Sequence, residues 1–120
     1  MKNILVISPH HDDESIGMGG TIYKLAKDGN AVVLAVVSSG SIGVEGANRE
    51  KSIFVRETEC LNASKVLNIR KVEFMRLYDY ILETNEENIF RLVKMIRNSR
   101  PDIIYMPHDN ETDLEHRRVC

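Results

Sequence analysis

Strand-like runs alternate with amphipathic segments along the whole chain, and this alternation limits the folds that the chain can adopt. The strand-like runs occupy residues 3–8, 32–37, 72–77 and 103–106. Apolar residues at consecutive positions are typical of strands that are buried on both faces, as in the interior of a parallel sheet. The alternation therefore predicts an α/β fold, in which helices cross over between parallel strands.

The segments between these runs have the spacing of amphipathic helices. Helices are predicted at about residues 21–28, at about 50–67, and from a capping box at 84–87 to the stop at Pro101. Gly29 and Asn68 follow the first two helices, where a left-handed residue commonly ends a helix. The side chains predicted to face the sheet are Ile22, Leu25 and Ala26, then Ile53, Cys60, Ala63 and Leu67, then Ile89, Leu92, Val93 and Ile96.

All four histidines lie in two acidic clusters, which follow the first and the last predicted strand. The first cluster is Ser-Pro-His-His-Asp-Asp-Glu at residues 8–14, and the second is His-Asp-Asn-Glu-Thr-Asp-Leu-Glu-His at residues 108–116. Open α/β sheets bind their ligands beyond the carboxyl ends of the strands. The two clusters can therefore face each other across one crevice.

Imidazole and carboxylate groups together bind a divalent ion such as zinc and leave coordination positions for water. His10 and Asp13 lie close together on the connection after the first strand, and His116 can supply a third donor from the start of a helix. A lone His-x-x-Asp pair is a weak signal, but the density of acidic and imidazole groups strengthens it. The clusters favour metal-assisted hydrolysis, and a solvated acidic loop with incidental histidines stays open as the alternative.

Gly17, Gly19 and Gly20 do not form a dinucleotide-binding motif. The Gly-x-Gly-x-x-Gly spacing fails at Ile22, and the acidic groups before the turn would repel a pyrophosphate. Close packing of a helix on a strand is the preferred role of these glycines. The loop at residues 38–46 carries further glycines and is expected to be flexible and to approach a ligand closely.

The composition argues against several classes of function. Sixteen basic and eighteen acidic residues give a net charge of -2, with mixed signs along the chain, which disfavours nucleic-acid binding. No transmembrane segment or signal peptide is recognisable. Cys60 lies on the apolar face of a predicted helix and forms no motif with Cys120, so it is expected to be a buried reduced thiol. We expect one cytoplasmic domain at residues 1–120, and a homo-oligomer is compatible with the sequence.

At its two clusters the chain resembles the PIG-L/LmbE-like family of zinc-dependent N-acetylglucosaminyl deacetylases. The family's first motif, Ala/Pro-His-Pro-Asp-Asp-Glu followed by Gly-Gly-Thr, corresponds to residues 9–14 and 19–21. Its second motif, His-x-x-x-x-His-Pro-Asp-His-Arg, corresponds to residues 108–117. Arg56 and Asp79 also resemble intermediate positions of the family.

The resemblance implies a role for each matched residue. His10, Asp13 and His116 would bind zinc, or alternatively Fe²⁺, Mn²⁺ or Co²⁺. Asp12 would be the general base that activates a water for attack on an acetamide carbonyl. Arg56 and Asp79 would bind the sugar.

Three departures from the family motifs are expected to lie around the metal ligands. His11 replaces a proline and brings a second imidazole to the first motif. Asp113 replaces a histidine that lies near the oxyanion, where a carboxylate would repel developing negative charge. Glu115 replaces an aspartate and keeps an acceptor for a neighbouring imidazole.

Together these patterns predict a Rossmann-like three-layer α/β/α fold with a mostly parallel sheet. Since family members are longer, we expect the chain to be the N-terminal portion of the family domain, with the C-terminal part missing. The expected activity is metal-dependent N-deacetylation of an N-acetylglucosamine-type conjugate, with a small amino sugar as the partner. Two alternatives stay open, namely a non-catalytic metal- or sugar-binding module and an amide hydrolase that acts on a non-sugar N-acyl substrate.

Overall fold

The protein folds as a parallel sheet with helices on both faces. A computed structural model describes residues 1–79 and 82–120. The elements follow in the order β1 (Asn3–Ser8), α1 (Asp13–Lys27), β2 (Ala31–Ser38), α2 (Arg49–Val66), β3 (Lys71–Leu77), α3 (Glu86–Ser99), β4 (Ile103–Tyr105) and α4 (Leu114–Val119). The strand order is β3-β2-β1-β4, and the strand pairs in the described residues are parallel.

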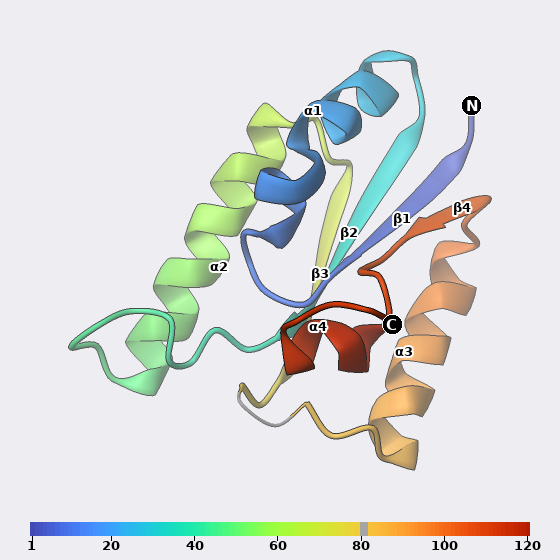
Figure 1. Cartoon of the computed structure of the whole chain (residues 1–120). Helices are drawn as coiled ribbons and strands as arrows, with labels where there is room; N and C mark the ends of the chain where they lie inside the picture. The colour runs from blue at the N-terminus through green and yellow to red at the C-terminus, as the bar shows by residue number, and fades with distance from the viewer. Residues whose placement is uncertain (80–81) are drawn as a thin grey trace.

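Two apolar layers form the core, one on each face of the sheet. Helices α1 and α2 cover one face, and α3 covers the other, as Figure 1 shows. Alternate residues of a strand point to opposite faces, so Ile4 and Val6 pack in the layer with Ile22 and Cys60. Leu5 and Ile7 pack in the other layer, against Leu92, Met95, Ile96 and Val119. The predicted three-layer α/β/α fold is therefore confirmed.

The predicted strands and the second helix are confirmed to within one residue at each end. Strand β2 lies between β1 and β3 and is buried along almost its whole length, as expected for an interior parallel strand. Gly29 and Asn68 both have the positive φ predicted for the ends of α1 and α2. Cys60 is buried and free, as expected. Among the described residues, no helix is both long and apolar enough to cross a membrane.

The prediction for the first helix was wrong at its start. Helix α1 begins at Asp13, and the expected glycine-rich bend lies inside it as a kink at Met18, where φ is -147°. Acidic groups in a first turn are favoured by the partial positive charge of a helix N-terminus, which explains why the helix includes Asp13 and Glu14. The acidic cluster is therefore partly helical.

The packing role predicted for the glycines of α1 was also wrong. A Cβ atom added at Gly17 or Gly20 would meet nothing within 4 Å beyond the helix itself. A Cβ at Gly19 would meet Leu67 at an ordinary 3.7 Å, which is a contact with the end of α2 and not with a strand. The three glycines instead lie close to Met18 in the chain, where the helix is kinked.

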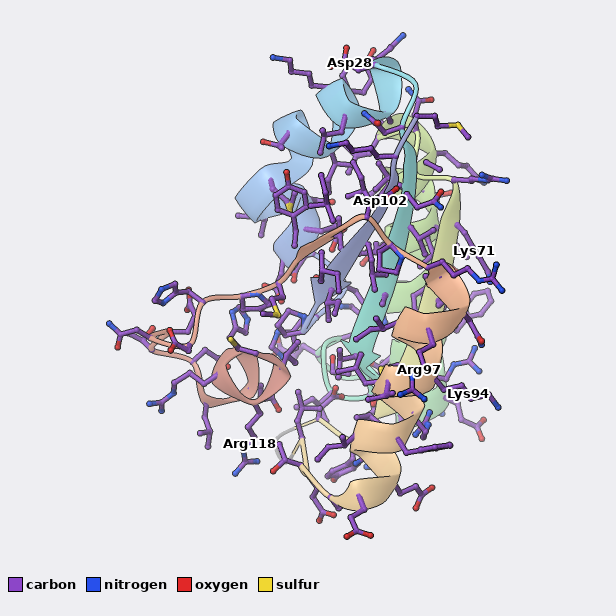
Figure 2. The ribbon with its side chains drawn as sticks, turned by 90° about the vertical axis from the view of Figure 1, so that its right-hand side faces the viewer. Asp28, Lys71, Lys94, Arg97, Asp102 and Arg118 are labelled. Atoms are coloured by element: carbon purple, nitrogen blue, oxygen red, sulfur yellow. The ribbon has the colours of Figure 1, made fainter. Side chains whose placement is uncertain are left out.

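Two details of α3 also differ from the prediction. Its N-cap is Asn85, whose side chain accepts a hydrogen bond from the backbone N–H of Asn88, so Thr84 does not cap the helix. Ile89 was expected to face the sheet but is 52% exposed, because the packed face of α3 is formed by Leu92, Met95 and Ile96. Figure 2 looks onto this side of the molecule and shows Lys94 and Arg97 on α3.

Candidate metal centre

The first histidine cluster is held by hydrogen bonds in the connection between β1 and α1. The Ser8 hydroxyl lies 2.7 Å from the carbonyl oxygen of His10 and 3.1 Å from Oε2 of the buried Glu14, and it hydrogen-bonds to both. The backbone N–H of His10 donates to Oδ2 of Asp13 at 2.8 Å. These contacts fix Asp13 in the first turn of α1 beside the ring of His10.

The second cluster reaches the same place through α4, which lies beyond the C-terminal ends of the strands (Figure 1). Asp113 is the N-cap of α4, and its side chain accepts hydrogen bonds from the backbone N–H groups of Glu115 and His116. A capping carboxylate satisfies N–H groups that have no partner within the helix. Asp113 therefore orients the helical turn that carries His116.

The structure brings His10, Asp13 and His116 together, as the sequence predicted. His10 Nδ1 lies 3.2 Å from Asp13 Oδ2 and 3.3 Å from His116 Nε2, and His116 Nε2 lies 3.3 Å from Asp13 Oδ2. We call these three atoms the donor triad. Four donors at about 2.0–2.1 Å from a tetrahedral ion lie about 3.3–3.4 Å from one another. The triad fits three corners of such a site, and the fourth corner remains for a water or a substrate atom.

The charges around the triad favour an ionised carboxylate. Burial raises the pKa of Asp13, but the hydrogen bonds from the ring and the backbone of His10 outweigh this effect and hold the pKa below its usual value. The hydrogen bond with Asp13, together with the contact with Glu115, raises the pKa of His10 to about 9 against the lowering effect of burial. A divalent ion at the triad would replace the proton of His10, since metal ligands must be deprotonated.

Asp12 directly precedes Asp13 in the chain and has an accessible carboxylate. It is the residue before α1, but its side chain makes no capping hydrogen bond. The side chain is 49% exposed, and Oδ2 lies 3.4 Å from a terminal nitrogen of Arg56. The Asp12 carboxylate is therefore accessible to water while it is paired with Arg56.

Two cavities adjoin the donor triad, and their sizes suit small molecules. The first, of about 350 Å³, is lined by Asp13 and His116, among others. The second, of about 420 Å³, is lined by His10, Glu115 and Arg56, among others, and we call it the Arg56 cavity. A ligand in either cavity lies next to the triad.

The two residues expected to bind sugar both line the Arg56 cavity. The Asp79 carboxylate is 3% exposed and accepts hydrogen bonds from the Ser39 hydroxyl, the Gly40 N–H and the Ser41 hydroxyl. Burial would raise the pKa of Asp79, but these hydrogen bonds hold it below its usual value. Asp79 therefore fixes the loop after β2, and the first residues of that loop are buried and not freely exposed.

The two remaining histidines differ from each other in their surroundings. The side chain of His108 is 78% exposed and lies outside both cavities. His11 is 5% exposed, stacks on Phe74 at 5.6 Å between ring centroids, and lines the Arg56 cavity. Burial, together with the charge of Arg56, lowers the pKa of His11.

Sequence reasoning missed three contributors to the site. Glu14 is a buried carboxylate that holds Ser8 and Ser15, although its place in an acidic cluster suggested solvent exposure. Glu111 lies 3.8 Å from His116 Nδ1, the ring nitrogen that points away from the triad. Ser38 lines the Arg56 cavity, and its position at the end of a buried strand was the available signal.

Comparison with protein families gives one match along nearly the whole chain. The sequence model described as PIG-L, GlcNAc-PI de-N-acetylase, matches residues 5–120. The chain is 36% identical to diacetylchitobiose deacetylase from Thermococcus kodakarensis over 110 residues, which cover 89% of this chain and 41% of that protein. The chain spans about half the length of the curated relatives that it matches.

Solved structures with the same fold include two kinds of enzyme. One is N,N'-diacetylchitobiose deacetylase from Pyrococcus horikoshii, with a TM-score of 0.91 and 31% identity, over 98% of this chain and 46% of that chain. Another is the 4-carboxy-2-hydroxymuconate hydratase GalB from Pseudomonas putida, with a TM-score of 0.89 and 25% identity, over 99% of this chain and 52% of that chain. The fold thus occurs with deacetylase and with hydratase activity.

Proposed function

Because the chain belongs to the PIG-L family of GlcNAc-PI de-N-acetylases, we propose that it catalyses the metal-dependent N-deacetylation of an N-acetylglucosamine-type sugar conjugate. The observation that carries this proposal is the donor triad of His10, Asp13 and His116, with separations of 3.2–3.3 Å. Relatives named for the removal of acetyl groups from acetylated amino sugars support the same activity.

The residues of the triad suit a divalent ion, and we propose zinc. Two imidazole nitrogens and one carboxylate oxygen form a common donor set of hydrolytic zinc sites, and iron, manganese and cobalt also accept such donors. A zinc ion bound there lowers the pKa of a coordinated water and polarises an amide carbonyl. Asp13 is held ready for this role by the N–H of His10, and His116 by the cap of α4.

Asp12 is the proposed general base. Its carboxylate takes a proton from the attacking water as the new C–O bond forms at the acetamide carbon. When the C–N bond breaks, the carboxylic acid of Asp12 returns this proton to the nitrogen of the leaving amine. The products are acetate and the free amino sugar. The ion pair with Arg56 at 3.4 Å holds the Asp12 side chain toward Arg56, which lines the Arg56 cavity.

The Arg56 cavity is the proposed sugar site. It lies between the triad and Arg56, and its volume of about 420 Å³ suits a single hexose ring. Arg56 forms the wall nearest Asp12, while Asp79 holds the loop that contributes Gly40 to the same cavity. We propose a small amino sugar as the partner and, because Cys60 and Cys120 are free, a reducing cytoplasmic location.

The test compares two substitutions in the site. Asp13→Ala removes a donor, so zinc content measured by mass spectrometry and acetate release from N-acetylglucosamine conjugates should both be lost. Asp12→Asn keeps the triad, so zinc content should persist while acetate release falls about 10²–10⁴-fold. Full zinc content and full activity in Asp13→Ala would overturn the ligand assignment.

A second candidate activity is favoured by the similarity to the hydratase GalB. The same triad and base could direct water to a carbon–carbon double bond, in which case no acetate forms. Incubation with unsaturated dicarboxylic acids and with acetylated amino sugars separates the two activities, since only the second substrate class yields acetate. The same assays test the two remaining alternatives. If the zinc-loaded chain binds the sugar but does not release acetate, it is a non-catalytic binding module. If it releases acetate only from non-sugar N-acetyl amines, it is a different amide hydrolase.

A further inference from the structure

Most of the buried polar side-chain atoms that have no hydrogen-bond partner belong to residues that line the Arg56 cavity. In the described part of the chain, six such side-chain atoms occur, and only Ser64 Oγ lies away from the Arg56 cavity. The others are both ring nitrogens of His11, Ser38 Oγ, Arg56 Nε and Glu115 Oε1. Buried polar groups are nearly always satisfied in native proteins, because an unmet hydrogen bond costs stability. Their concentration indicates that a polar ligand completes this cavity.

His11 contributes the largest unmet hydrogen-bonding capacity on this wall. Its ring is 5% exposed, stacks on Phe74 with planes 21° apart, and cannot turn toward solvent without leaving that contact. The backbone at Gly40 lies against the ring edge and against Arg56, since a Cβ there would be 2.8 Å from His11 Cε1 and 3.1 Å from Arg56 Cβ. The packing therefore fixes the imidazole edge against the backbone of Gly40, which also packs against the start of the Arg56 side chain.

The charges around the cavity indicate an uncharged partner for this edge. Asp79, Asp113 and Glu115 line the cavity with carboxylates, while Arg56 is already paired with Asp12. An anionic ligand would meet net negative charge there. Both ring nitrogens of His11 have no hydrogen-bond partner, and a hydroxyl group can donate to or accept from such a nitrogen without bringing a charge into the cavity.

We propose that His11 is a specificity-determining residue, which hydrogen-bonds a hydroxyl group of the sugar ring in the Arg56 cavity. This inference rests on the proposed function, because it takes the cavity as the sugar site. At this position the family motif has a proline, whose side chain offers no hydrogen bond. His11 would thus let this chain recognise one hydroxyl group of the sugar. A relative with proline at this position has no side chain there that can bind that hydroxyl group.

The experiment measures sugar binding in a form that does not turn over. The full chain carrying Asp12→Asn is titrated, in the presence of Zn²⁺, with N-acetylglucosamine and with its 3-deoxy, 4-deoxy and 6-deoxy derivatives, and binding is followed by NMR. The same titrations are done after adding His11→Phe, which keeps an aromatic ring on Phe74 but removes both nitrogens. His11→Gln tests rescue by a hydrogen-bonding side chain, and His108→Phe is the matched control, since it removes an exposed imidazole.

His11→Phe should weaken binding of N-acetylglucosamine about 3–10-fold, the effect of one hydrogen bond. One deoxy sugar should bind the parent protein more weakly by the same factor and show no further loss in His11→Phe, because both changes remove the same contact. His11→Gln should recover part of the affinity, and His108→Phe should change nothing. Thermal stability without sugar should not fall in His11→Phe, since an unpartnered polar ring is replaced by an apolar one.

The proposal is overturned if His11→Phe binds N-acetylglucosamine as tightly as the parent, if it loses equal affinity for all the deoxy sugars, or if the parent binds none of these sugars. These outcomes are separate from a failure of the proposed function. A chain that releases no acetate but shows the hydroxyl-specific loss keeps the assignment of His11 and refutes the deacetylase. A chain that releases acetate while His11→Phe binds all the sugars normally refutes only the assignment.

Discussion

Glu115 contacts the ring nitrogen of His10 that points away from the donor triad. Its Oε2 lies against His10 Nε2, while His10 Nδ1 faces Asp13 and His116. A carboxylate on the outer nitrogen of a metal-binding histidine holds the proton on that nitrogen, so the inner nitrogen presents a lone pair. Glu115 therefore sets both the orientation and the tautomer of His10 for binding a metal.

Glu115→Ala should weaken zinc binding by about 10–100-fold, the usual effect of removing such a partner. Glu115→Asp should keep part of the affinity, because it retains the carboxylate but shortens its reach. Competition titration with a coloured chelator measures the affinity. Asp109→Asn is the control, since this carboxylate is 81% exposed and forms an ion pair with the exposed His108. Equal zinc affinity in Glu115→Ala and in the parent would contradict the assignment.

Asp113 should affect zinc binding through the fold of α4 and not through its charge. Asp113→Ala removes the acceptor for the N–H groups of Glu115 and His116, so unfolding free energy should fall by about 1 kcal/mol. Zinc affinity should fall with it, because His116 is held less firmly. Asp113→Asn can still cap the helix and should keep both properties, as measured by urea unfolding and by zinc titration.

The N-cap of α3 provides a matched control for this prediction. Asn85→Ala also removes a capping side chain, at a helix far from the triad in the chain. It should lower the unfolding free energy by a similar amount and leave zinc affinity unchanged. A loss of zinc affinity in Asp113→Asn as large as in Asp113→Ala would indicate that the negative charge matters directly.

The strands and the convergence of the two clusters could be predicted because they depend on local pattern and on topology. Ile4 to Ile7 are apolar at consecutive positions, which identifies a buried strand without knowledge of its neighbours. Parallel strands then place His10 and His116 at the same edge of the sheet. The sequence was therefore sufficient for the architecture and for the location of the candidate site.

Other features depend on packing that no local pattern encodes. Helix α1 continues through three glycines of low helix propensity, because its apolar face is buried against the sheet. Asp79 and Ser41 are 38 residues apart, and their hydrogen bond exists only once β2 and β3 are paired. The role of Asp113 as a cap also required coordinates, because the sequence alone does not show whether its side chain accepts hydrogen bonds from the first turn of α4.

The buried Asp79 should make the stability of the fold depend on pH in acid. Because its pKa is lower in the folded protein than its usual value of 3.8, Asp79 stabilises the fold above that value. This contribution is lost as the pH falls through the folded pKa. Asp79→Asn removes the titration, so the difference in unfolding free energy between the parent and this variant should be largest near neutral pH and shrink in acid. Urea unfolding at about pH 7, 4 and 3 measures it, and a difference that does not change with pH contradicts the prediction.

Gly40 should tolerate substitution less well than Gly46, although both have the same kind of backbone conformation. Their φ angles are +70° and +72°, so alanine at either position carries the strain of a left-handed residue, about 1–2 kcal/mol. At Gly46 the added Cβ would meet nothing within 4 Å, whereas at Gly40 it would lie 2.8 Å from His11 Cε1. Urea unfolding should therefore show a greater loss of unfolding free energy for Gly40→Ala than for Gly46→Ala. The excess measures how firmly Phe74 and the loop after β2 hold the His11 ring.

The ring signals of His11 in NMR spectra should shift in Gly40→Ala and stay unchanged in Gly46→Ala. Equal losses in the two variants would mean that the His11 ring moves freely, which is incompatible with an imidazole edge fixed on the cavity wall.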